Sequence, residues 1–153
     1  MDRQQFLLEM RKNHTLKGRK PCFVSLRFNA GKIYNEGYSE FIMSFRDGVI
    51  YFQKLSRFLK RLQPSGDFEL RARRFKKYDI MQKSFINILY LYEDNDRFID
   101  ICYQVGKREN SSTMSNIQRI VDEMVELYNI KSCQEEIKNE PEEDTDSEGK
   151  GSN

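Results

Sequence analysis

The chain has 153 residues and a mass of 18.3 kDa, which suits one ordinary domain and is too short for two. Apolar residues make up 38% and charged residues 33%, and 11 Phe and 8 Tyr supply the bulk for one small core. No stretch approaches the ~18 uninterrupted apolar residues of a spanning helix, so a transmembrane protein is excluded. The first ten residues also lack the apolar run of a secretory signal, so we expect a cytoplasmic protein.

The formal net charge of +2 conceals two unlike parts. Residues 135–153 hold eight acids and two bases, a net charge of −6, which leaves +8 on residues 1–134. This tail has one aliphatic residue, Ile137, and no aromatic residue, so it cannot bury enough apolar surface to offset its ordering entropy. We therefore expect a short helix and basic linker over 1–21, a folded domain over 22–131 and a disordered acidic tail over 132–153.

The first elements follow from hydrophobic periodicity. Phe6, Leu7 and Met10 share one face of a helix predicted over 2–12. A basic linker follows up to Pro21. Residues 22–28 then alternate between apolar and polar side chains, which predicts a strand.

A β-hairpin over residues 40–53 is the clearest local signal. Asp47-Gly48 is typical of a two-residue type I′ turn, which requires positive φ at both central positions. That turn places Phe45 opposite Ile50 and points both toward the core. Ser44 then points the other way, toward solvent, so an aspartate at this position is expected to be mild.

The remaining chain predicts further strands and one long helix. Residues 54–63 fit either a short basic amphipathic helix or a ragged extension of the preceding strand. The other predicted elements are strands over 68–73, 78–82, 84–92 and 97–105, and an amphipathic helix over 112–130.

This order of elements resembles a pleckstrin-homology-like domain of the bacterial kind. Residues 41–52 look like the first strong hairpin of that family, and residues 78–80 look like the short strand before its central pair. The resemblance implies an α+β, mainly β fold: an antiparallel half-open barrel of about seven strands, capped by a C-terminal amphipathic helix. It also implies a binding scaffold for anionic lipid headgroups or peptides, without catalysis. The loop over 29–39 holds one base, Lys32, so the basic pattern of the phosphoinositide-binding members is missing.

Residues for catalysis or metal binding are scarce. The chain has one histidine, His14, and three cysteines, Cys22, Cys102 and Cys133, at no metal-ligand spacing. Without an export signal we expect free thiols. We therefore expect no enzyme activity, no cofactor and no metal.

Basic residues are the one pattern that points to a site. Residues 54–83 carry ten bases against three acids, a net charge of +7. The candidate anion-binding or partner-binding residues are Arg57, Lys60, Arg61, Arg71, Arg73, Arg74, Lys76 and Lys77. Such a face attracts an acidic protein or the anionic lipid headgroups of a membrane, and nucleic acid is the alternative partner. The alternative interpretation is that these charges belong to an ordinary solvated surface that binds no partner.

Two further features distinguish these partners. Aromatic side chains exposed on the sheet would favour single-stranded nucleic acid, because bases stack on them. An exposed apolar pair at Phe58 and Leu59, beside the bases of 57–61, would favour a membrane. The oligomeric state is left open by the sequence.

Overall fold

The computed structural model describes residues 3–56, except 29–38, and residues 61–134. These residues form one sheet and two α-helices, α1 (Arg3–Lys12) and α2 (Ser111–Tyr128). The strands of the sheet are β1 (Arg19–Phe28), β2 (Ser39–Arg46), β3 (Val49–Lys54), β4 (Phe68–Arg71), β5 (Lys77–Gln82), β6 (Ile86–Glu93), β7 (Asp96–Gln104) and β8 (Lys131–Ser132). Three 3-10 turns lie between them: η1 (Pro64–Gly66), η2 (Ala72–Arg74) and η3 (Arg108–Asn110).

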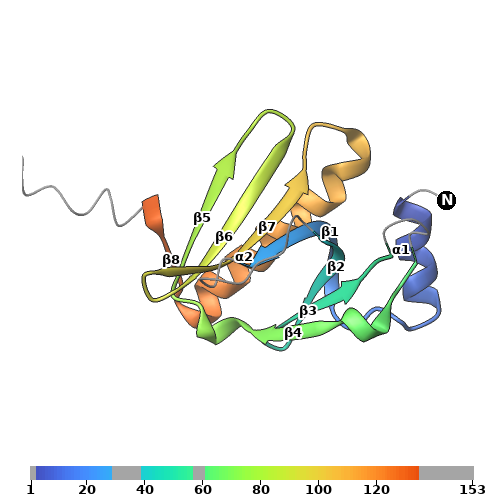
Figure 1. Cartoon of the computed structure of the whole chain (residues 1–153), viewed down its shortest axis with the longest axis horizontal. Coiled ribbons are helices and arrows are strands. Elements are labelled where there is room, and N and C mark those ends of the chain that lie inside the picture. The colour runs from blue at the N-terminus through green and yellow to red at the C-terminus, as the bar shows by residue number, and fades with distance from the viewer. Residues whose placement is uncertain (1–2, 29–38, 57–60, 135–153) are drawn as a thin grey trace, which may run out of the picture.

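The strands follow the order β4-β3-β2-β1-β7-β6-β5-β8, with β1 joining two halves of the sheet (Figure 1). All neighbours are antiparallel except β5 and β8, which are parallel, so the sheet is mixed and open at β4 and β8. The prediction of an α+β, mainly β chain with one C-terminal helix is confirmed. The two-residue β8, which the sequence pattern did not reveal, adds an eighth strand. Neither described helix is long and apolar enough to cross a bilayer.

The β2–β3 hairpin has the predicted turn and register. Asp47 and Gly48 have φ values of 50° and 79°, the positive angles that a type I′ turn requires. Phe45 lies opposite Ile50, as expected, and both side chains are buried in the main core. The turn residues and the hydrophobic alternation therefore predicted the same pairing of strands, and the structure has it.

Helix α2 covers the inner face of the sheet (Figure 1). Its apolar stripe contributes four fully buried side chains to the main core: Ile117, Ile120, Val121 and Met124. Asn129 ends the helix in the left-handed conformation, with φ of 59°, and its N–H donates to the Val125 carbonyl. The preceding Tyr128 then lies against Gly48, where a larger side chain would collide with its hydroxyl.

Helix α1 forms a further layer on the outer face of β1–β3. Leu7 and Met10 pack against Ile42 and Leu55 in a second, smaller core. Between α1 and β1 the chain passes close over β2. At Gly18 the approach is so close that an added Cβ would lie 2.7 Å from the Ser44 hydroxyl oxygen. After this approach, β1 begins at Arg19, three residues before the start of the predicted strand.

This layer overturns one expectation. Ser44 is 0% exposed, and its hydroxyl has no hydrogen-bond partner among the described residues. The expectation that Ser44 faces solvent is therefore wrong. Alternation along a strand identifies its two faces, but it does not show whether another segment covers the second one.

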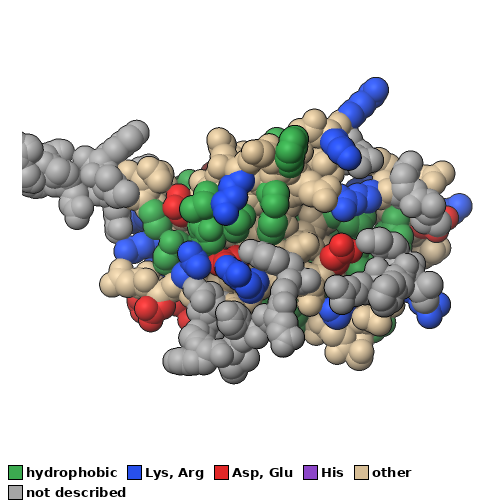
Figure 2. Space-filling model, turned by 45° about the horizontal axis from the view of Figure 1, so that its top comes forward, with side chains coloured by type: hydrophobic (Ala, Val, Ile, Leu, Met, Phe, Trp, Pro, Cys, Tyr) green, Lys and Arg blue, Asp and Glu red, His purple; other side chains and the backbone are tan. Residues whose placement is uncertain are grey.

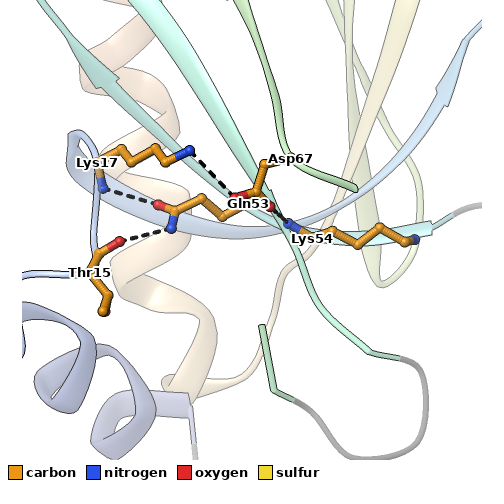
Figure 3. A network of polar contacts seen from close by, with 5 residues as sticks. All are labelled: Thr15, Lys17, Gln53, Lys54 and Asp67. Carbon is orange, nitrogen blue, oxygen red and sulfur yellow. Dashed lines mark hydrogen bonds and ion pairs between the residues drawn. The ribbon is translucent and has the colours of Figure 1, made fainter. Parts of the chain in front are cut away.

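A polar network fixes the segment between α1 and β1 (Figure 3). The Gln53 amide accepts from the Lys17 N–H at 3.0 Å and donates to the Thr15 carbonyl at 2.8 Å. Asp67 accepts from the Lys54 N–H at 2.8 Å and lies 3.5 Å from the Lys17 ammonium. The predicted basic linker is therefore attached to β3 and to the residues before β4.

The connection from β3 to β4 is only partly described. Leu55 and Leu62 form an antiparallel bridge, which agrees with an extended continuation of β3 at these residues. Residues 57–60, which the helical alternative requires, lie outside the described part of the chain. They include Phe58 and Leu59, the apolar pair that would favour a membrane. The strand predicted over 68–73 ends at Arg71, where η2 begins.

Candidate binding surface

The eight predicted binding residues do not form one patch. Arg57 and Lys60 lie outside the described residues, and Arg61 is exposed at the end of the β3–β4 connection. The other five follow one another through the end of β4, η2 and the start of β5: Arg71, Arg73, Arg74, Lys76 and Lys77. Arg61 lies apart from this group: its carbonyl accepts from the Ser56 N–H just beyond the end of β3, whereas Arg71 pairs with Val49 at the start of β3, roughly 20 Å away.

Buried residues determine how the chain turns between β4 and β5. Ala72 is fully buried, and its N–H donates to the Gly48 carbonyl at 2.9 Å. Phe75 is 1% exposed, and its N–H donates to the Ala72 carbonyl at 3.1 Å. Since both ends of η2 are held in this way, Arg73 between them is directed to solvent.

Arg74 is bound within the molecule. Its Nε and Nη2 atoms both lie 2.7 Å from one carboxylate oxygen of Glu93. Its guanidinium carbon also lies 4.2 Å from the centroid of the Phe98 ring, a cation–π contact. Arg74 therefore attaches η2 to the β6–β7 hairpin, and it is a poor candidate for binding an external anion.

Lys77 is also bound locally, since its ammonium donates to Asn95 Oδ1 in the β6–β7 turn at 2.8 Å. By contrast, Arg71, Arg73 and Lys76 are exposed. Their side chains form no ion pair or hydrogen bond with another described residue. Within the run from Arg71 to Lys77, these three side chains can therefore bind an anion without giving up a partner among the described residues.

Lys131 adds a fourth base that sequence reasoning missed. Its N–H donates to the Lys76 carbonyl at 3.0 Å, because β8 runs parallel beside the start of β5. The side chain is exposed and has no side-chain partner among the described residues. We call these four side chains, Arg71, Arg73, Lys76 and Lys131, the basic corner. A two-residue strand has no periodicity, so the sequence held no signal for this contact.

The outer face of β5–β7 carries hydrophobic side chains with basic ones among them (Figure 2). Tyr90 lies on this face but is only 7% exposed, because the Arg97 guanidinium lies 4.4 Å from its ring centroid. The neighbouring Asp100 is fully buried, with Arg27 at 3.2 Å and Arg97 at 3.1 Å. The ring of Tyr90 is therefore covered and is not a platform on which a base can stack.

The thiols are in environments that disfavour reaction. Burial raises the pKa of Cys22 and of Cys102 above the ordinary value, because a thiolate loses its hydration there. Cys22, Cys102 and Cys133 form no disulfide with one another. Because a raised pKa leaves less thiolate at neutral pH, both thiols in the sheet are disfavoured as nucleophiles.

Comparisons with known proteins add distant structural similarity and no family. No family profile matches the chain, and no curated protein matches it in sequence. Among solved structures, it is similar to the hSac2 domain from the human phosphoinositide phosphatase Sac2, with a TM-score of 0.48 and 8% identity. That similarity covers 86% of this chain and 89% of the other.

Proposed function

We propose that this chain is a non-enzymatic binding module that holds an anionic partner at the basic corner. The observation that carries the proposal is the state of the four side chains, which are exposed and have no internal partner among the described residues. Arg71, Arg73 and Lys76 lie on or beside the turn fixed by Ala72 and Phe75, and Lys131 is joined to Lys76, so little backbone order has to be gained on binding. Opposite charge on a partner would speed association and make it sensitive to salt.

We also propose the finer description of the fold, a half-open pleckstrin-homology-like domain. The strand order supports it: β1 joins the β2–β4 half to the β7–β5 half, and α2 covers the inner face. The order of elements along the chain, with α2 after β7, is the one on which the resemblance rests. A binding scaffold without catalysis agrees with the raised pKa values of the two sheet thiols.

We propose an acidic protein or an anionic membrane surface as the partner, and the cytoplasm, in part at a membrane, as the location. Nucleic acid is the alternative. Two observations speak against it at the basic corner: the Tyr90 ring is covered by Arg97, and the neighbouring Arg74 is held against Phe98. At the basic corner, single-strand binding would therefore rest on charge alone.

A parallel titration tests the proposal. The full chain is titrated with phosphatidylserine vesicles, a poly-glutamate peptide and a single-stranded oligonucleotide, at about 50 and 300 mM salt. Binding to vesicles or peptide that weakens at the higher salt supports the proposal. Tighter binding to the oligonucleotide assigns the alternative, and binding to none of the three overturns both.

A further inference from the structure

The apex of the β5–β6 hairpin carries the most exposed large apolar side chain of the described residues. Phe85 is 75% exposed, compared with 58% for Leu8 and Leu127. The Lys83 N–H donates to the Ile86 carbonyl at 2.8 Å, so only Ser84 and Phe85 form the apex. A ring in this position cannot turn back into the main core on the inner face of the sheet.

A second segment fixes this apex. The Val105 N–H donates to the Phe85 carbonyl at 3.0 Å, which attaches the apex to the chain leaving β7. Gly106 then turns the chain with φ of 91° into η3. We call residues 83–86 and 105–108 together the aromatic tip. In Figure 1 the β5–β6 hairpin projects from the sheet beside the end of β7.

The aromatic tip is cationic around its apolar apex. Lys83, Lys107 and Arg108 are exposed, and none of the eight residues of the tip is acidic. A hollow of about 550 Å³ lies behind the apex, lined by Phe85, Val105 and Lys107 among others. The Phe85 ring therefore borders open space, with positive side chains on both segments.

We propose that the aromatic tip inserts into the interface of an anionic bilayer, as a second contact independent of the basic corner. An aromatic ring buries its apolar part among lipid headgroups, and lysine or arginine stems extend along it while their charges reach the phosphates. Phe85 and the three bases supply both parts of that contact on one rigid apex.

The size of the tip favours a bilayer over a second protein copy. A phenylalanine buries about 150–250 Å² at most, whereas a stable protein interface needs roughly 800 Å² on each partner. Three like charges around the ring would also repel the same tip of a second copy. A bilayer accepts a small projecting apex and supplies the opposite charge.

The aromatic tip and the basic corner can be tested separately. They lie at opposite ends of the β5–β6 hairpin, whose strands of six and eight residues span roughly 20 Å. That distance exceeds the ~8 Å over which exposed charges act at physiological salt. Failure of the tip therefore leaves the function proposed for the corner intact, and the reverse also holds.

Insertion is tested by fluorescence of the full-length Phe85→Trp variant. The chain has no tryptophan, so the new residue is the only such fluorophore. We expect its emission to shift to the blue on adding phosphatidylserine vesicles, and to be quenched by brominated acyl chains. The Leu127→Trp variant is the matched control, since Leu127 is exposed on α2, and should do neither. A tip tryptophan that stays solvated on bound vesicles overturns the proposal.

Binding strength gives the second readout. We expect Phe85→Ala to weaken vesicle binding about tenfold, and Leu127→Ala to leave it unchanged. The double variant Lys83→Glu, Lys107→Glu should weaken binding to phosphatidylserine vesicles but leave its melting temperature near that of the wild type. Unchanged vesicle binding of Phe85→Ala overturns the proposal. So does a blue shift that depends on protein concentration without vesicles, because it would assign the tip to self-association.

Discussion

At the scale of single residues, burial on the outer face of β2 changes what a substitution costs. Ser44 and Phe45 are adjacent in the chain and lie on opposite faces of the sheet, yet both are buried, at 0% and 2% exposure. The N-terminal segment covers Ser44 at Gly18, and the main core surrounds Phe45. A charged side chain is therefore destabilising at either position.

We predict that Ser44→Asp is as damaging as Phe45→Asp. An unpaired carboxylate buried beneath Gly18 costs several kcal/mol, about 3–5, against a typical domain stability of about 5–15 kcal/mol. Arg46→Asp, exposed on the same strand, is the control and should be mild. Urea denaturation compares the three. A Ser44→Asp variant as stable as Arg46→Asp would show that the N-terminal segment does not cover this position.

Thiol labelling gives a second prediction at this scale. Cys133 is half-buried, whereas Cys22 is fully buried and its pKa is raised by burial. At pH 8 we expect a thiol-specific reagent to label Cys133 in the folded protein, and Cys22 only after unfolding, because burial removes both access and the thiolate. Mass spectrometry of labelled peptides identifies the modified residues. Labelling of Cys22 at the rate of Cys133 under native conditions would contradict this burial.

At the scale of elements, residues next to each other in the chain were predictable and distant contacts were not. The β2–β3 hairpin follows from Asp47-Gly48, because the turn residues and the alternation are local. α2 follows from its apolar stripe for the same reason. The docking of α1 depends on Gln53, and the place of Lys131 depends on a carbonyl 55 residues earlier in the chain, so neither has a local signal.

The Gln53 network gives a prediction for α1. Gln53→Ala leaves the Thr15 carbonyl and the Lys17 N–H without their partner, which should cost about 1–3 kcal/mol. The variant should also be cut faster by trypsin near Lys12, at the end of α1. Gln82→Ala, exposed on β5, is the control. Equal stability and equal cleavage of the two variants would show that this network does not hold α1 in place.

The candidate site was predictable only in part, because its internal partners come from distant parts of the chain. Counting charges found Arg71, Arg73 and Lys76, because they lie close together in the chain. It also included Arg74 and Lys77, whose partners Glu93 and Asn95 are brought to them only by the β6–β7 turn. A count of charges cannot separate a base that is bound internally from one that is available.

At the scale of the whole molecule, the acidic tail begins beside the basic corner. Lys131 is joined to Lys76, and residues 135–153, with a net charge of −6, follow four residues later. Residues 135–153 lie outside the described part of the chain. The disorder that their composition predicts would give the tail a local concentration on the order of millimolar, enough for a weak electrostatic contact. We expect the tail to compete with external anions for the corner.

Deleting residues 135–153 should therefore strengthen binding to phosphatidylserine vesicles at low salt, and the gain should shrink as salt rises. A full-length variant with the tail acids changed to their amides should behave like the deletion. Vesicle sedimentation with the three proteins measures the effect. Equal affinities at low salt would leave the tail without a role at the corner.

The central claim is that the basic corner binds the partner, and charge reversal tests it most directly. The variant Arg71→Glu, Arg73→Glu, Lys76→Glu is compared with Arg11→Glu, Lys12→Glu, Arg119→Glu, which exchanges three exposed charges elsewhere. Each variant replaces three positive charges by three negative ones, so both have the same net charge. The corner variant should melt near the wild-type temperature, because exposed charges contribute little to stability.

The measurement is the affinity of both variants for the anionic ligand that binds the wild type, at low salt. The account predicts a loss of at least about tenfold for the corner variant and a much smaller loss for the control, because local charge, not net charge, forms the contact. Wild-type affinity in the corner variant, or an equal loss in both variants, would contradict it.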